Sequence, residues 1–429
     1  MILAGKKASY TTLGCKLNFS ETSTIRQKLE EAGTVTVENR AAADLCIINT
    51  CSVTDVAEHK GRQLIRQVIH RNPDAVVVVV GCYAQLRAEE LLKIEGVNLV
   101  LGAKDKFRIR EYLEKMKTPD GREFYGCDVF KLAGFDLAYS YGDRTRSFLK
   151  IQDGCDYFCS YCTIPYARGK SRSATISEVE QAVNELVEKG IREIILTGVN
   201  TGDFGRGRNE NFLELIRRLD QNTAAERFRI SSIEPNLLTN GIIEAIASSA
   251  RFMPHFHIPL QSGNNEVLRL MKRRYDREVF AEKVRTIREI CPDAFIGVDV
   301  IAGMNGETLS YFEDSRDFIA DQDVSQLHVF PYSERNGTRA LEIGERVPKP
   351  EKQRRVNELL EISARKQSGF AHRFIGHSRP VLFEANNHRG KMSGFTDNYL
   401  RVEQPFDGMQ INRIVSVLLS AENLQKYGD

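Results

Sequence analysis

Three cysteines in one short loop carry the clearest chemical signal in the sequence. Cys155, Cys159 and Cys162 follow Gly154 at a three-then-two spacing. Thiolates are the usual protein ligands of iron–sulfur clusters, and three of them on a four-iron cluster leave one iron open. The amino and carboxylate groups of S-adenosylmethionine (SAM) could chelate that iron. The alternatives are a zinc site, which in its structural form takes four protein ligands, or three unrelated core cysteines.

Three further cysteines each follow a predicted strand and precede a helical pattern. They are Cys15, Cys51 and Cys82, placed after the strand-like runs at residues 9–13, 44–49 and 75–80. Apolar runs separated by amphipathic segments of about fifteen residues predict a parallel sheet with helices on both faces. Ligands bind at the carboxyl ends of such strands, so we expect the three thiols to meet as ligands of a second cluster. Periodicity alone leaves open the alternative of three buried structural thiols.

Length and composition indicate a globular protein of about three domains, since 429 residues are too many for one core. Hydrophobic residues make up 41% and charged residues 28% of the chain. The apolar run at 75–80 is far shorter than the roughly twenty residues of a membrane span. Residues 1–7 lack the apolar core of a signal peptide. Nine cysteines, an odd number, argue against a disulfide framework and predict a cytoplasmic location without membrane contact. Cys46, Cys127 and Cys291 are assigned to packing.

The pattern of elements predicts an α/β protein of three units. Residues 1–120 form an open parallel α/β domain, and residues 118–143 read as a linker with a strand around 125–132. Residues 140–367 contain six strands with helices between them, which predicts a partial (β/α)6 barrel with its site at the carboxyl ends of the strands. Residues 368–429 hold short alternating runs that predict a small β-barrel.

A basic excess is hidden by the net charge of +2. Residues 144–172 contain six Lys and Arg against two Asp and Glu, and residues 349–401 contain eleven against five. Such patches usually form a solvated surface, but beside a cysteine loop and in a C-terminal module they fit a polyanion. Nucleic acid is therefore the leading candidate for the substrate.

Five motifs, at residues 12–18, 49–53, 80–85, 150–169 and 257–263, resemble the methylthiotransferase family of radical SAM enzymes. The resemblance covers essentially the whole chain and implies an N-terminal methylthiotransferase domain, a radical SAM core and a C-terminal RNA-binding TRAM domain. The start Leu-Gly-Cys-Lys-Leu-Asn and residues 197–203 are more similar to the branch acting on threonylcarbamoyladenosine in tRNA. The isopentenyladenosine branch usually reads Tyr-Gly-Cys-Gln-Met-Asn, and the ribosomal-protein branch Leu-Gly-Cys-Pro-Lys-Asn. These two substrates are the alternatives.

The resemblance implies two 4Fe-4S clusters and two SAM molecules. No side chain can activate a carbon–hydrogen bond of an adenine ring by acid–base chemistry, so a cofactor must do so. The cluster on Cys155, Cys159 and Cys162 would reduce SAM to a 5′-deoxyadenosyl radical that takes hydrogen from C2 of the base. The cluster on Cys15, Cys51 and Cys82 would supply sulfur. The implied partners are a tRNA anticodon stem-loop and an electron donor such as flavodoxin or ferredoxin, and we expect a monomer.

Four polar or aromatic residues are predicted to bind the cofactor. Tyr161, just before the third loop cysteine, is expected to line the SAM adenine, although an exposed loop aromatic would look the same. Asn200, Glu234 and Gln261 each follow a core strand, which places them at the barrel mouth. Turn or capping roles are the alternative for these three.

Two other groups receive weaker assignments. His255 and His257 point the same way along one strand, as a metal pair would, but with iron held by cysteines we assign them to packing. A threonylcarbamoyl group carries a carboxylate, and Arg168, Lys170 or Arg172 beyond the cysteine loop is expected to meet it.

Two rival classes fit part of the pattern. A sulfur-inserting enzyme acting on a protein would not need the basic β module. A redox-sensing RNA-binding protein would not need a three-cysteine loop with an open iron. Cleavage of SAM by the reduced protein separates the second rival from an enzyme.

Overall fold

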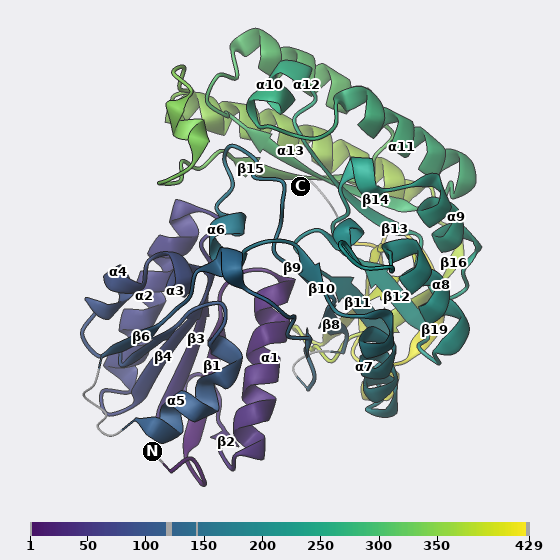
Figure 1. Cartoon of the computed structure of the whole chain (residues 1–429). Helices are drawn as coiled ribbons and strands as arrows, with labels where there is room; N and C mark the ends of the chain where they lie inside the picture. Colours follow the sequence, from purple (N-terminus) through teal and green to yellow (C-terminus); the bar gives the residue numbers. More distant parts are fainter. Residues whose placement is uncertain (1, 117–121, 143–144, 426–429) are drawn as a thin grey trace.

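The computed structural model describes residues 2–116, 122–142 and 145–425 (Figure 1). Its N-terminal unit is a parallel sheet in the order β2-β1-β3-β4-β5-β6. The strands are β1 Lys7–Thr12, β2 Val35–Thr36, β3 Leu45–Thr50, β4 Val76–Gly81, β5 Leu99–Leu101 and β6 Glu123–Tyr125. The helices are α1 Lys16–Glu31, α2 Asp55–Arg71, α3 Cys82–Leu86, α4 Ala88–Leu92 and α5 Ile109–Lys115.

Helices cover both faces of this sheet, as the apolar runs predict. One core joins α1 and α5 to inward residues such as Ile47 and Val78, and the other joins α2, α3 and α4 to residues such as Ile48 and Val79. Every residue of β3 and β4 is buried. Since helices cover both faces of the sheet, the side chains on either face of these strands lie in a core.

The second unit is a half-barrel of parallel strands with helices outside (Figure 1). Its strands are β8 Ser147–Lys150, β11 Glu193–Thr197, β12 Arg227–Ile230, β13 His255–Gln261, β14 Phe295–Ala302 and β15 Gln326–Pro331. Its main helices are α7 Ile176–Glu188, α8 Phe212–Asn222, α9 Asn240–Ser248, α10 Asn265–Leu270, α11 Arg277–Ile290, α12 Leu309–Asp321 and α13 Lys349–His372. The backbone hydrogen-bond ladder is interrupted between β12 and β13. Isolated bridges such as Ser232–His257 join the two sheets there.

The C-terminal unit is a four-stranded antiparallel sheet in the order β18-β17-β16-β19. Its strands are β16 Ser378–Phe383, β17 Lys391–Thr396, β18 Arg401–Pro405 and β19 Ile414–Leu418. It docks on the amino ends of the barrel strands. Arg229 donates to the carbonyl oxygens of Thr396 and Asp397, and the Tyr399 ring packs at an angle against the rings of His255 and Phe295, so the sheet closes the barrel floor. A closed TRAM-type barrel stays a prediction.

The linker is more structured than its composition suggests. The prediction of a strand around 125–132 is wrong in its position. The strand β6 ends at Tyr125, and Val129–Lys131 form a 3-10 helix. β7 Ala138–Tyr139 then pairs antiparallel with β8. Residues 117–121 and 143–144, which include the expected domain boundary at 120 and the start of the basic stretch at 144, lie outside the described residues. Among the helices that are described, none is both long and apolar enough to cross a membrane.

Candidate iron–sulfur sites

The cysteine loop is closed at its base by a short antiparallel pair. β9 (Gln152–Asp153) pairs with β10 (Arg172–Ser173), and the Cys155 N–H donates to the Gly169 carbonyl oxygen at 3.0 Å. Gly154 has a φ of +73°, and a Cβ there would lie 2.0 Å from the Lys170 carbonyl oxygen. Only glycine fits this position, so the residue before the first cysteine fixes the entry of the loop.

Each sulfur of the loop accepts a hydrogen bond. The donors are Tyr157 N–H to Cys155 at 3.4 Å, Arg273 Nη1 to Cys159 at 3.0 Å and Ile164 N–H to Cys162 at 3.5 Å. Burial raises the pKa of Cys155 to about 12, with a smaller upward contribution from the nearby Cys159. Bare thiolates would be unfavourable in this crowded loop, whereas a bound metal deprotonates a coordinating thiol outright. The donor set therefore fits a metal cluster, whose sulfur ligands commonly accept such hydrogen bonds.

Cys15, Cys51 and Cys82 meet at one rim of the N-terminal sheet. They follow β1, β3 and β4, which are neighbouring strands, and Cys15 caps α1. Burial raises the pKa of Cys51 to about 12, with smaller upward contributions from Cys82 and Cys15. A Cβ on Gly14 would lie 3.0 Å from the Cys51 Cβ. All six thiols of the two sites are free, as cluster ligands must be.

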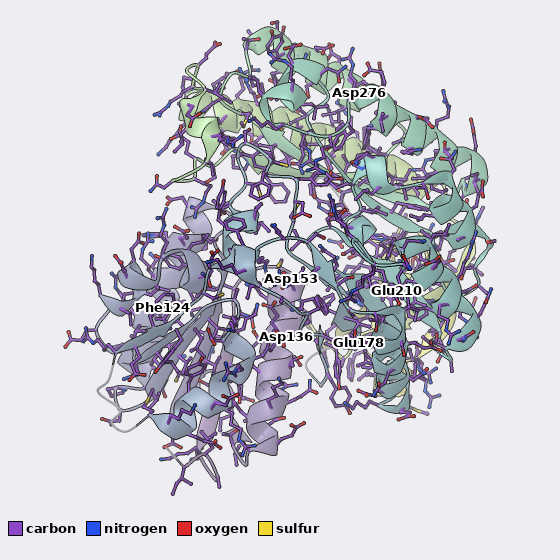
Figure 2. All side chains as sticks on the ribbon, viewed as in Figure 1. Phe124, Asp136, Asp153, Glu178, Glu210 and Asp276 are labelled. Atoms are coloured by element: carbon purple, nitrogen blue, oxygen red, sulfur yellow. The ribbon has the colours of Figure 1, made fainter. Side chains whose placement is uncertain are left out.

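Arg168 joins the two cysteine sites. It ends α6 (Ile164–Arg168), the helix that follows Cys162, and its Nε lies 3.3 Å from the Cys82 sulfur. Its Nη1 donates to Glu21 at 2.9 Å and to Asp153 at 3.0 Å. Asp153 lies where the N-terminal unit meets the barrel (Figure 2). The expectation that Arg168 meets the substrate is therefore wrong, because its guanidinium is buried and fully used.

Glu21 is the centre of this buried charge cluster. Its side chain is fully buried and contacts Lys106 at 2.7 Å, Lys150 at 3.2 Å and Arg168. Burial alone would raise the pKa of Glu21, but the three cations together hold it well below its usual value. For a depressed carboxyl pKa, the stability gain is complete above the unfolded value of about 4 and is lost as the pH falls.

We expect Glu21→Gln to lower the unfolding free energy by about 3–5 kcal/mol at neutral pH, because it leaves several buried cations facing one remaining carboxylate. Glu31→Gln, at an exposed position of the same helix, is the matched control. Urea unfolding of the cluster-free proteins followed by circular dichroism measures the difference. Equal midpoints for the two variants would contradict a structural role for the buried cluster.

The predicted cofactor residues surround the cysteine loop to different degrees. Asn200 is buried with both side-chain amide atoms unpartnered, which leaves hydrogen-bonding capacity for a ligand. Glu234 forms an ion pair with Arg273, and the Arg273 Nη1 lies 3.5 Å from the Tyr161 hydroxyl. The Tyr161 ring packs on an apolar cluster that includes Met271 and Met304.

Gln261 and the two histidines complete the set. Gln261 has a φ of +68° at a register shift in β13, so the backbone bends there. His255 is a packing residue, as predicted, between Phe295 and Tyr399. His257 is not, because its Nε2 lies 2.8 Å from an Asp299 carboxylate oxygen.

Arg273 is the functional candidate that sequence reasoning missed. It lies in the basic run 272–274, which reads as an ordinary solvated turn. No periodicity marks it, because its role depends on the tertiary approach of a loop after α10 to the cysteine loop.

Comparisons with known proteins agree with this geometry. Residues 149–319 match the Radical SAM superfamily, and residues 7–102 match the uncharacterized protein family UPF0004. A threonylcarbamoyladenosine tRNA methylthiotransferase MtaB of Bacillus subtilis is 36% identical over 95% of this chain and 92% of its own. The Aquifex aeolicus MtaB is 34% identical over 96% of this chain and all of its own. A tRNA-2-methylthio-N(6)-dimethylallyladenosine synthase of Clostridium botulinum is 30% identical over 96% of this chain and 94% of its own.

A solved structure supports the fold. The radical SAM methyltransferase TsrM of Kitasatospora setae superposes with a TM-score of 0.58 at 15% identity, over 76% of this chain and 73% of that one. The predicted enzyme class is confirmed, and with it the use of a 4Fe-4S cluster and SAM that defines radical SAM enzymes. The chain belongs to the radical SAM methylthiotransferase family, whose MtaB members from Bacillus subtilis and Aquifex aeolicus are 36% and 34% identical to it.

Proposed function

We propose that this enzyme transfers a methylthio group to C2 of an adenosine beside the anticodon of tRNA, where the adenosine already carries a threonylcarbamoyl group on N6. The observation that carries the proposal is the approach of two three-cysteine sites to one another, with Arg168 between them. Relatives bearing the threonylcarbamoyladenosine name reach 34–36% identity, whereas those named for dimethylallyladenosine reach 30%. The isopentenylated base is thus the alternative, and a ribosomal protein is less supported.

Each of the two proposed clusters would have its own role in the reaction. When bound, the loop cluster would supply the electron that cleaves one SAM, and the N-terminal cluster would supply sulfur that a second SAM methylates. Arg168 and its buried carboxylate partners fix the distance between the two sites, which is the positioning that such a transfer requires. Asn200 offers its unpaired amide, and Glu234 its carboxylate, to SAM at the mouth of the barrel.

A ring of aromatic side chains beside the cysteine loop suits an RNA loop as substrate. Phe130, Phe158 and Tyr166 lie with ring centroids 6.0–6.1 Å apart. Phe130 and Tyr166 are 39% and 40% exposed, which is high for large aromatic residues. Unpaired bases of single-stranded RNA stack on such surfaces, and a target base can be turned out of its stack.

The domain and partner assignments are part of the proposal. Residues 1–120 would be the methylthiotransferase domain, 140–367 the radical SAM core and 368–429 the TRAM domain. The partners would be a tRNA anticodon stem-loop and an electron donor such as flavodoxin or ferredoxin. We place the enzyme in the cytoplasm, where a tRNA substrate would be met, and we expect a monomer.

Anaerobic turnover with two anticodon stem-loops tests the substrate. The stem-loops are identical except for N6, which carries threonylcarbamoyl in one and isopentenyl in the other. We expect methylthiolated product, identified by mass spectrometry of digested nucleosides, from the threonylcarbamoyl stem-loop at a higher kcat/KM. Preference for the isopentenylated stem-loop would contradict the substrate but leave the family's chemistry standing.

A further inference from the structure

Arg168 directs a fixed positive charge at one sulfur of the N-terminal cysteine site. Its Nε donates to the Cys82 sulfur at 3.3 Å. Its Nη1 donates to Glu21 and Asp153, and its Nη2 donates to Asn18 and Glu21. A guanidinium has five N–H groups, so all of them are engaged and its direction is fixed.

Asn18 links the same guanidinium to a second cysteine of the site. Its Oδ1 accepts from the Arg168 Nη2 at 2.8 Å and lies 3.7 Å from the Cys15 sulfur. Its Nδ2 donates to the carbonyl oxygens of Leu13 and Thr50, which belong to the segments that lead to the cysteines. The cation is therefore part of the rim on which the cysteines lie.

The buried charges around Arg168 do not cancel. Lys106 lies 2.7 Å from Glu21, and Lys150 lies 3.2 Å from the same carboxylate. Lys150 also lies 3.4 Å from Asp153. Each of these five residues is at most 3% exposed. Three cations against two carboxylates leave one positive charge in the interior, which is unfavourable unless an anion joins it.

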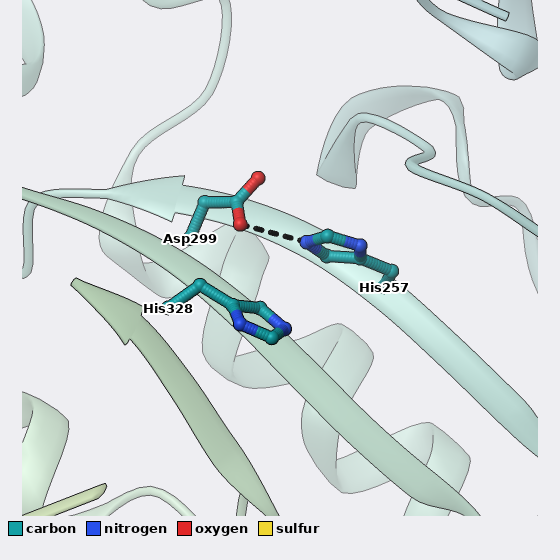
Figure 3. A group of neighbouring side chains, drawn as sticks. All are labelled: His257, Asp299 and His328. Atoms are coloured by element: carbon teal, nitrogen blue, oxygen red, sulfur yellow. Dashed lines mark hydrogen bonds and ion pairs between the residues drawn. The ribbon is translucent and has the colours of Figure 1, made fainter. Parts of the chain in front are cut away.

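The carboxylate that faces the barrel lumen, Asp299, does not supply this anion. Val298, which precedes it on β14, lies in the core between strands and helices, so Asp299 points to the other face. Its Oδ1 lies 2.8 Å from the His257 Nε2, and the His328 ring lies beside them (Figure 3). Among the described residues, these three side chains form no hydrogen bond or ion pair with Arg168 or with a cysteine sulfur. The anion that the guanidinium contacts directly at the rim is the sulfur of the N-terminal site, in its thiolate form.

The cysteine loop has a balanced counterpart of this contact. Arg273 Nη1 donates to the Cys159 sulfur at 3.0 Å, and the same guanidinium pairs with Glu234. One cation meets one carboxylate there, whereas positive charge is in excess beside Cys82. The two sites thus differ in charge, although an arginine donates to one sulfur of each.

We propose that Arg168 raises the reduction potential of the N-terminal cluster through its positive charge and its hydrogen bond to the Cys82 sulfur. The inference rests on the proposed function, since it takes Cys15, Cys51 and Cys82 as the ligands of that cluster, and it names the residue that sets the cluster's potential. Uptake of one electron from the proposed electron donor makes the cluster and its thiolates more negative by one charge, and no proton moves. Hydrogen bonds to the sulfurs and the local charge set such potentials, and a buried cation favours the more negative state.

Potentiometry of a chain with a single cluster measures this effect. The full chain with Cys155, Cys159 and Cys162 replaced by alanine, here called the single-cluster chain, is expected to keep only the N-terminal cluster. Dithionite and redox mediators are added anaerobically without SAM or RNA, and electron paramagnetic resonance follows the reduced form. We expect Arg168→Gln to lower the equilibrium constant for one-electron reduction about 10-fold, which corresponds to about 59 mV. Arg168→Lys keeps the charge but lacks the forked guanidinium, so it should lower the constant less.

Two further variants of the single-cluster chain separate charge from packing. Glu21→Gln removes a carboxylate from the same buried group and should raise the potential, whereas a loss of packing alone would move it in the same direction as Arg168→Gln. Arg229→Gln is the matched control, because Arg229 is also buried and pairs with the buried Glu193 at 2.8 Å, at the barrel floor. It should leave the potential as in the single-cluster chain.

Each outcome decides for or against the inference. An unchanged or raised potential in Arg168→Gln would overturn it, and so would an unchanged or lowered potential in Glu21→Gln. If Arg168→Gln holds no cluster, Arg168→Lys and Glu21→Gln must still shift the potential in opposite directions, and shifts of the same sign would overturn the inference. An equal shift in Arg229→Gln would show a general effect of losing a buried cation and would also overturn it. A single-cluster chain that binds no iron at its N-terminal cysteines would contradict the proposed function itself.

Discussion

Replacing Cys155, Cys159 and Cys162 by alanine is expected to abolish the formation of 5′-deoxyadenosine from SAM. The three sulfurs lie in one closed loop and each accepts a hydrogen bond, so the loop would hold the cluster whose open iron binds SAM. Chromatography of anaerobic reactions with a strong reductant measures the product. Cys291→Ala, at a partly buried cysteine outside both sites, is the control and should retain cleavage. Substantial cleavage by the triple variant would contradict the assignment of the loop.

Replacing Cys15, Cys51 and Cys82 by alanine should have a different effect. We expect the methylthiolated product to disappear, whereas SAM is still cleaved in a reaction that is no longer coupled to product formation. The reason is that these thiols hold the proposed sulfur source and leave the cysteine loop intact. Cys46→Ala, at a buried cysteine within β3, is the matched control, because its sulfur lies inside the sheet and accepts a hydrogen bond from Ser9. Iron content should fall from about eight to about four per chain in either triple variant. Methylthiolated RNA from this variant would show that the second site is not the sulfur source.

The rim of the N-terminal sheet could be predicted because the signals are local. β3 and β4 are rich in apolar residues, and Cys51 and Cys82 follow them directly, so parallel pairing alone brings the thiols to one edge. The spacing of Cys155, Cys159 and Cys162 is likewise visible in a single loop. Such features need no knowledge of how distant segments meet.

Features that depend on packing between units could not be predicted. Arg168 looked like an exposed cation of a basic stretch, yet it is buried against Glu21, which is far away in sequence. Part of the basic stretch at 349–401 is paired within the fold: Arg354, for example, forms ion pairs with Glu351 and Glu358. Composition counts charges but does not show which of them find partners.

The C-terminal sheet also has a role that composition did not suggest. Alternating runs predicted a separate β module at residues 368–429. In the fold this sheet accepts hydrogen bonds from Arg227 and Arg229 and forms the barrel floor. Removing it would expose buried arginines, so substitutions on its surface test RNA binding more cleanly than a truncation does.

Nucleoside analysis of tRNA from a strain that lacks this gene tests the central claim most directly. The account predicts that threonylcarbamoyladenosine persists in that tRNA while its 2-methylthio derivative is absent. Wild-type protein should restore the derivative, and neither triple-cysteine variant should do so. Persistence of 2-methylthio-threonylcarbamoyladenosine, together with loss of the methylthiolated isopentenyl nucleoside, would contradict the account.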